Sequence, residues 1–134
     1  MKKFLNPIEF PYEGFIQKSL EQHFEHLGFN LEKDGQVDLI VEKGTEKWII
    51  EAKGITQAIG TDFNTCIGQL VKSMTTDQAK YAIAIPKDIK YKRQCDLLPD
   101  YFKQLVQLHI MVVDKEGYIK IIEPGQKIEL SYFE

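Results

Sequence analysis

The chain has 134 residues, a length that suits one domain with its own hydrophobic core. Hydrophobic residues make up 43% and charged residues 28%, which is typical of a globular protein and argues against a disordered or fibrous one. The net charge of −3 excludes a globally basic nucleic-acid-binding protein, so contact with nucleic acid would need a local basic surface. We expect residues 1–134 to form a single domain.

The expected location of the protein follows from its cysteines and its apolar segments. Cys66 and Cys95 lack metal-ligand spacing, and two free or buried thiols fit a reducing cytosol, with one disulfide between them as the alternative. The apolar start of the chain runs into Pro7 and Glu9, and no segment approaches the roughly 18 apolar residues of a membrane span. We expect a cytoplasmic protein without membrane contact.

The first half of the chain carries the signals of one helix and three strands. Residues 1–11 contain two prolines and are expected to be irregular, and apolar residues then recur at helical spacing over 12–27. Three segments with strand patterns follow, separated by the turn sequences Asp34-Gly35 and Lys43-Gly44-Thr45: residues 29–33, 36–42 and 47–53.

The second and third of these strands alternate between apolar and polar residues. The second strand is expected to place Val37 on one face and Asp38 on the other. The third places Glu51 and Lys53 together, opposite its apolar residues. If the two strands pair with their apolar faces on one side, Asp38, Glu51 and Lys53 share the other side, where we expect a functional cleft.

The second half of the chain predicts a crossover helix and a central strand. Thr61 or Asp62 would cap a helix over 62–75, and the apolar run 80–85 is typical of a central strand in parallel pairing. A helical region interrupted by Pro99, two strands and a short edge strand are expected over residues 88–107, 109–114, 118–123 and 124–134 respectively. The fold class is therefore α/β, or α+β with a mixed sheet, in the order α-β-β-β-α-β with a C-terminal helical region and two further strands.

The tripeptide Glu51-Ala52-Lys53, together with Asp38, suits the hydrolysis of phosphodiesters. Mg²⁺ prefers oxygen ligands and keeps several waters, so the carboxylates of Asp38 and Glu51 and the carbonyl of Ala52 would hold it, with Mn²⁺ as a substitute. The metal would neutralise phosphate charge and acidify the attacking water. Lys53 would stabilise developing negative charge or, with a lowered pKa, assist proton transfer. Solvated charges are the alternative, but Asp38 and Glu51 lie in apolar runs.

The order of Asp38, a hairpin, and Glu51-Ala52-Lys53 after an apolar run resembles the core of the PD-(D/E)xK nuclease superfamily. The helix that follows carries Asp62, Gly68 and Gln69 in a pattern similar to that of several branches, including the element-excision controlling factors and resolvase-like branches. The resemblance implies a restriction-endonuclease-like core over residues 12–85. It also implies an active site of four residues, namely Asp38, Glu51, Lys53 and Gln69. An ordinary surface glutamine is the alternative for Gln69.

The same resemblance leaves one position of the site open. The first helix of the superfamily often carries a glutamate that binds or orients the metal. Gln17 falls near that position when the helix end at Gly28 is matched, Glu21 lies one turn later, and Glu13 is a third choice. A missing acid at this position would weaken metal affinity.

A basic segment provides the expected contact with nucleic acid. Between Lys72 and Arg93 the chain has six basic residues and only two aspartates, and residues 87–93 combine Lys side chains with Tyr91. Such a surface would bind DNA phosphates in a salt-sensitive, sequence-independent way. The alternative is a solvated helix start.

Three hypotheses about function follow. The first is a Mg²⁺-dependent DNA endonuclease of a recombination, excision or defence system, acting as a homodimer because cutting two strands often uses two copies of a small catalytic domain. The second is a catalytically weak or inactive module of the same fold that binds nucleic acid or a protein partner. The third is a structural or metabolic α/β protein that binds no metal.

Overall fold

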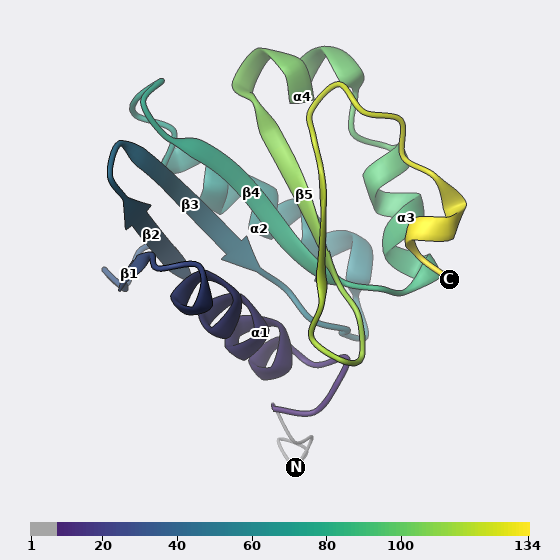
Figure 1. Ribbon diagram of the computed structural model, residues 1–134. Coiled ribbons are helices and arrows are strands. Elements are labelled where there is room, and N and C mark those ends of the chain that lie inside the picture. Colours follow the sequence, from purple (N-terminus) through teal and green to yellow (C-terminus); the bar gives the residue numbers. More distant parts are fainter. Residues whose placement is uncertain (1–7) are drawn as a thin grey trace.

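Six strands form one sheet in the computed structural model, which describes residues 8–134 (Figure 1). They lie in the sheet in the order in which they occur along the chain. Part of the expected irregular arm over 1–11 lies outside the described residues, and residues 8–12 form turns and bends. The strands span Asn30–Glu32 (β1), Leu39–Lys43 (β2), Glu46–Ala52 (β3), Lys80–Pro86 (β4), Leu108–Val113 (β5) and Ile119–Ile122 (β6).

The sheet is mixed because turns join some strands and helical crossovers join others. β1, β2 and β3 pair antiparallel, β3, β4 and β5 are parallel, and β6 is antiparallel to β5. All residues of β4 after Lys80 are buried, as expected for a central strand covered on both faces. The register places Ile50 of β3 between Leu39 of β2 and Ala82 of β4.

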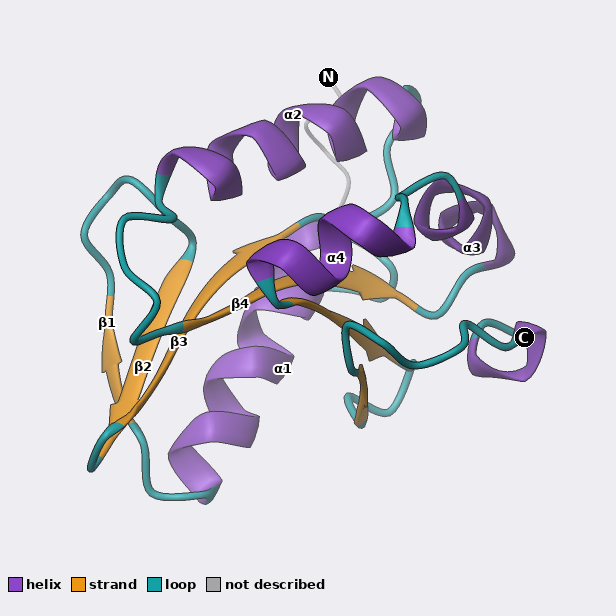
Figure 2. Cartoon of the chain, turned by 90° about the horizontal axis from the view of Figure 1, so that it is seen from above, coloured by secondary structure: helices purple, strands orange, loops and turns teal. Residues whose placement is uncertain are grey.

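Within the described chain, four α-helices cover the two faces of this sheet (Figure 2). α1 packs on one face through Ile16, Leu20 and Phe24, and α2, α3 and α4 cover the other. Successive residues of β3 therefore enter different cores, since Ile50 packs with α1 and Ile49 with α2. The helices span Glu13–His26 (α1), Ile59–Lys72 (α2), Ile89–Asp96 (α3) and Asp100–Val106 (α4).

The predicted order α-β-β-β-α-β, followed by a helical region and two strands, is confirmed. The helical region divides into α3 and α4 around Pro99, whose missing amide N–H and ring disfavour a continuous helix. No helix within residues 8–134 combines the length and hydrophobicity that a membrane span requires.

Two predictions about the ends of elements are wrong. α2 begins at Ile59 and has no side-chain capping bond, so neither Thr61 nor Asp62 caps it. The tail forms a 3₁₀ turn at Leu130–Tyr132 where an edge strand was expected. Phe133 is buried in the core that lies between α2, α3 and the sheet, so the end of the tail packs against this core.

The predicted start of the second strand is also wrong. β2 begins at Leu39, and Val37 packs with Ile40 and Ile49, on the face opposite Leu39. The cause is local, because Asp34 Oδ1 accepts hydrogen bonds from the amide nitrogens of Gln36 and Val37. These bonds turn residues 34–37 out of the strand, so Asp38 lies directly before the first residue of β2.

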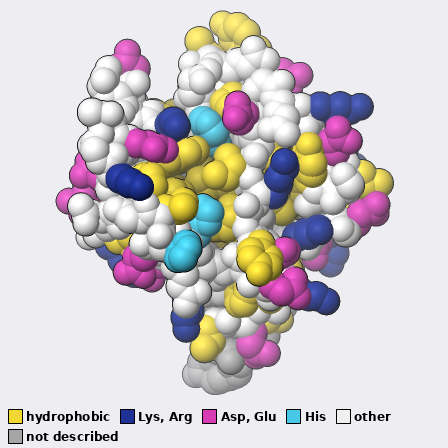
Figure 3. Space-filling model, in the orientation of Figure 1, with side chains coloured by type: hydrophobic (Ala, Val, Ile, Leu, Met, Phe, Trp, Pro, Cys, Tyr) yellow, Lys and Arg dark blue, Asp and Glu magenta, His cyan; other side chains and the backbone are white. Residues whose placement is uncertain are grey.

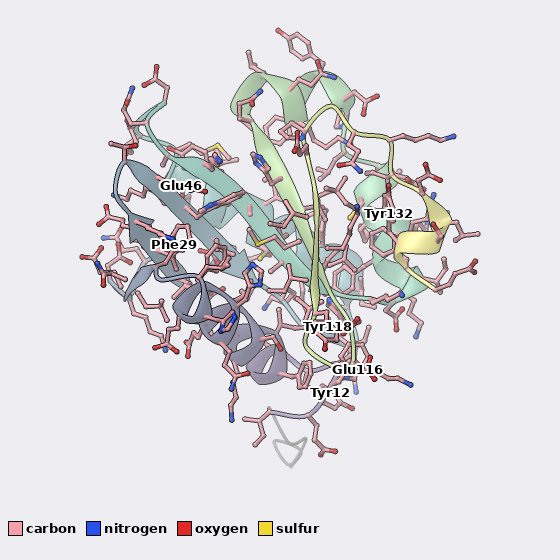
Figure 4. The ribbon with its side chains drawn as sticks, viewed as in Figure 1. Tyr12, Phe29, Glu46, Glu116, Tyr118 and Tyr132 are labelled. Carbon is pink, nitrogen blue, oxygen red and sulfur yellow. The ribbon has the colours of Figure 1, made fainter. Side chains whose placement is uncertain are left out.

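The beginning of α1 lies at the end of the sheet where β3, β4 and β5 have their carboxyl termini. Figure 4 shows Tyr12, which precedes α1, beside Glu116 and Tyr118 of the β5–β6 turn. In that turn Gly117 has a φ of 88°, and a Cβ there would lie 3.3 Å from Ser19 Oγ of α1. In open sheets with parallel strands this end is the usual place of ligand sites.

Candidate active site

Asp38 and Glu51 lie side by side at this end of the sheet. Glu51 is the penultimate residue of β3 and is only 3% exposed. Asp38 reaches across from the entrance of β2, and its Oδ2 accepts a hydrogen bond of 2.7 Å from the amide nitrogen of Ala52. The two carboxyl groups therefore meet beside the end of β3, although Asp38 lies outside β2.

The Glu51 carboxyl is held in an environment that disfavours its charge. Burial first, then the negative charge of Asp38 and a hydrogen bond with it, and then the charge of Glu13 raise the pKa of Glu51 to about 8. Glu51 Oε2 is buried and has no hydrogen-bond partner. It is the only buried side-chain nitrogen or oxygen of residues 8–134 that lacks one. A buried oxygen without a donor is costly, so a cation or a proton is the natural partner for this site.

Lys53 follows β3 directly and pairs with the first residue of α1. Its Nζ lies 3.1 Å from Glu13 Oε1, and its side chain is 26% exposed. Burial alone would lower the pKa of Lys53, but the hydrogen bond and the charge of Glu13 outweigh it and raise the pKa above its ordinary value. In this arrangement Lys53 is a fixed positive charge.

Gly54 brings the end of β3 against the start of α1. A Cβ at Gly54 would lie 2.2 Å from the amide nitrogen of Glu13, which no side chain could tolerate without displacing the helix. The amide nitrogen of Ile55 donates to the carbonyl of Pro11 at 2.8 Å. The hydroxyl of Tyr91 donates to the carbonyl of Gly54 at 2.6 Å. This close approach is what places Glu13 beside Lys53.

A cavity of about 610 Å³ opens in front of the two carboxyl groups. Gln69 reaches it from the exposed side of α2, so the structure brings Gln69 to the same cavity as Asp38 and Glu51. Lys53 is connected to it through Glu13. The cavity is lined by Glu13, Gly14, Gln17, Lys33, Gly35, Gln36, Val37, Asp38, Glu51 and Gln69.

The three α1 side chains considered for the open position differ in their surroundings. Glu13 and Gln17 line the cavity, whereas Glu21 pairs with Lys33 at 2.7 Å. Burial would raise the pKa of Glu21, but hydrogen bonds from Lys33 and Gln17 lower it. Glu13 is thus the α1 carboxylate nearest to the site, although its partner is Lys53.

The donor set fits a hard divalent cation that keeps most of its waters. Residues 8–134 contain no group of three or more His, Cys, Asp or Glu side chains arranged to hold a metal. Two carboxylates and a main-chain carbonyl are nevertheless enough for Mg²⁺, which binds proteins through one or two carboxylates and retains water. The buried, partnerless Oε2 of Glu51 provides an oxygen for such an ion. The carbonyl of Ala52 remains a predicted ligand.

The cysteines take no part in this chemistry. Both Cys66 and Cys95 are buried free thiols. Burial, followed by the charge of Glu51, raises the pKa of Cys66 to about 12, so its thiol is not a nucleophile.

The basic segment differs from its prediction in one important respect. Tyr91 is fully buried and bonded to Gly54, so it cannot stack on a base. Lys92 pairs with Asp96 at 2.7 Å, while Lys90 and Arg93 are exposed. On the α1 side of the sheet, which is the side seen in Figure 3, acidic and basic side chains are interspersed.

Comparison with known proteins finds similarity in structure only. No family model matches the chain, and no curated protein matches its sequence. An XisH family protein from Nostoc punctiforme PCC 73102 is similar in structure, with 19% identity and a TM-score of 0.55, over 78% of this chain and 95% of that one. An FdxN element excision controlling factor protein from Anabaena variabilis is similar with 20% identity, the same TM-score and the same coverage. At this identity, the likeness establishes a shared fold.

Proposed function

We propose that this chain is a Mg²⁺-dependent endonuclease of the PD-(D/E)xK type that hydrolyses phosphodiester bonds of DNA. The observation that carries the proposal is the buried Oε2 of Glu51, which has no partner and lies beside a second carboxylate. A protein interior tolerates such a pair when a proton or a cation lies between the two groups. The Asp38, Glu51, Lys53 and Gln69 pattern and the fold shared with XisH family proteins support the same assignment.

In this proposal each side chain of the site has a separate task. Asp38, Glu51 and the carbonyl of Ala52 would hold the ion, which when bound neutralises phosphate charge and acidifies the attacking water. Glu51 gives up its proton on loading, since both carboxyl groups must then be ionised. Lys53 keeps its positive charge and stabilises the negative charge that develops on the phosphate oxygens. Gln69 offers amide hydrogens or its oxygen to the substrate from α2.

The biological setting of the proposal is the excision of a DNA element or a related recombination process. One of the structural neighbours is an element excision controlling factor, and its fold is the fold of this chain. We propose DNA as the substrate, the cytoplasm as the location, and a homodimer as the active form. The molar mass of the protein in solution, by light scattering, tests the homodimer.

The second candidate is a module of the same fold that binds nucleic acid or a protein partner and does not cleave. Its support is the Glu13–Lys53 ion pair, which occupies the lysine, together with the absence of a group of three or more metal-binding side chains within residues 8–134. Binding to DNA that persists in excess chelator, with no cleavage under any condition, is the result that favours it.

Cleavage assays with isosteric variants test the nuclease proposal. Supercoiled, linear, single-stranded and branched DNA are incubated with the protein and Mg²⁺ or Mn²⁺. We expect cleavage by the wild type and none by Glu51→Gln or Lys53→Met, with both variants folded. Glu32→Gln, at an exposed position of the same sheet, serves as the matched control and should cleave normally. Cleavage that survives both active-site substitutions would exclude this site.

A further inference from the structure

Gln17 lies beside Asp38, but none of the tasks proposed above uses its side chain. Its amide nitrogen lies 3.0 Å from the main-chain oxygen of Asp38 and 3.0 Å from Glu21 Oε2. A main-chain carbonyl accepts and never donates, and the carboxylate of Glu21 likewise accepts. The amide nitrogen of Gln17 must therefore be the donor in both bonds and uses one hydrogen for each.

Glu21, the second partner of the Gln17 amide, is itself held in place by an ion pair. Glu21 accepts from Lys33 Nζ at 2.7 Å, and Lys33 stands at the start of the loop that leads to Asp38. Helix α1 thus holds this loop at both ends, because Glu21 binds Lys33 and Gln17 binds Asp38. Between these points the loop is stiffened by the bonds that Asp34 accepts from Gln36 and Val37.

Asp38 is consequently held from two sides. Gln17 holds its main-chain oxygen, and the amide nitrogen of Ala52 holds its carboxylate at 2.7 Å. The bond to Ala52 is the contact that places the Asp38 carboxylate next to Glu51. Because Asp38 precedes β2, no ladder hydrogen bond of that strand fixes its position, and the bond to Gln17 takes over this task.

We propose that Gln17 is a positioning residue that sets the Asp38 carboxylate for metal binding, and that it is not a metal ligand. This inference rests on the proposed function, because it assigns Gln17 a part in the same site. Gln17 stands near the position where nucleases of this type often carry an acid that binds or orients the metal. A ligand role and a positioning role for Gln17 predict opposite effects for one substitution.

Gln17→Glu is the discriminating change. If the position is a ligand position, a carboxylate there adds a third acid and tightens Mn²⁺ binding. If Gln17 positions Asp38, the substitution sets a negative oxygen against the carbonyl of Asp38 and the carboxylate of Glu21, and binding weakens. Groups that orient metal ligands typically contribute about 10- to 100-fold to metal affinity, and we expect a loss in this range for Gln17→Glu and for Gln17→Met.

The first measurement is calorimetric titration with Mn²⁺. The matched control is Gln22→Met, at an exposed glutamine of the same helix that does not line the cavity; its affinity should equal that of the wild type. Tighter binding by Gln17→Glu, or affinity unchanged in both Gln17 variants, would overturn the proposal.

The second measurement needs no metal and therefore separates this inference from the nuclease proposal. Residue-resolved hydrogen exchange reports the Ala52 amide, which the Asp38 carboxylate protects. We expect its exchange to be at least about 10-fold faster in Gln17→Met and unchanged in Gln22→Met, with the β4 amides still protected as proof of a folded core. An unchanged Ala52 amide overturns the positioning role. If the wild type binds no Mn²⁺ but the Ala52 amide still exchanges faster in Gln17→Met than in the wild type, the nuclease proposal is refuted. The positioning role of Gln17 then stands.

Discussion

Glu51→Gln should stabilise the metal-free protein at alkaline pH, although it removes the proposed metal ligand. The folded protein raises the pKa of Glu51 from 4.5 to about 8, first by burial and then by the charge of Asp38. A tenfold change in proton affinity corresponds to about 1.36 kcal/mol, so ionised Glu51 destabilises the fold by a few kcal/mol, with roughly 5 as the upper bound. Rearrangement of the Asp38 loop would reduce this value.

The sign follows from the direction of the shift. A carboxyl with a raised pKa in the folded state contributes its full stability below about pH 4.5. This contribution is lost as the pH rises towards about 8 and stays lost above it. Glutamine carries no charge at any pH, and its amide can donate to Asp38 as the protonated carboxyl does. We therefore expect equal stability of wild type and Glu51→Gln near pH 5, and a more stable variant near pH 9.

Urea unfolding with excess chelator at several pH values measures the difference. The control is Glu32→Gln on β1, where the side chain is exposed and the difference from wild type should not vary with pH. A free-energy difference between wild type and Glu51→Gln that is the same near pH 5 and near pH 9 would show that Glu51 titrates alike in the folded and unfolded chains, contrary to this prediction.

Three further predictions concern the scaffold and the ion. Gly54→Ala should lower the free energy of unfolding by about 3 kcal/mol or more, because its Cβ would lie 2.2 Å from the Glu13 amide nitrogen. Gly68→Ala, whose Cβ would meet no atom within 4 Å, should raise it by up to about 1 kcal/mol. Urea unfolding measures both, and equal effects would contradict the close approach of Gly54 to α1. Tyr91→Phe should cost about 1–3 kcal/mol because it leaves the buried carbonyl of Gly54 without its donor, and an unchanged stability would contradict this. Mn²⁺ affinity should rise with pH up to about 8 and then level off, because the ion displaces the Glu51 proton; calorimetry that finds a constant affinity over this range would contradict that exchange.

The sequence predicted the strand that carries Glu51 and the side of the sheet that it shares with Asp38. The strand follows from the alternation of its side chains, which local residues determine, whereas Asp38 reaches Glu51 through its bond to the Ala52 amide. The sequence did not predict that Asp38 lies outside β2, because the Asp34 turn that displaces Val37 competes with a strand pattern that looks unbroken.

Contacts between distant segments were beyond prediction. The Lys53–Glu13 pair depends on the meeting of Gly54 with the start of α1, and nothing in either segment specifies the other. Tyr91 was expected on a basic surface because basic neighbours surround it, but its position on α3 turns it inward, where its hydroxyl reaches Gly54. Its burial follows from the packing of α3 on the sheet, which a single helix sequence does not reveal.

The nuclease proposal requires Asp38 and Glu51 to hold one divalent cation together. Calorimetric titration of the wild type with Mn²⁺, repeated with Asp38→Asn and Glu51→Gln, tests it most directly. We expect one ion per chain for the wild type and loss of binding in each variant, with all three proteins folded. A wild type that binds no ion, or binding that both variants retain, would contradict it.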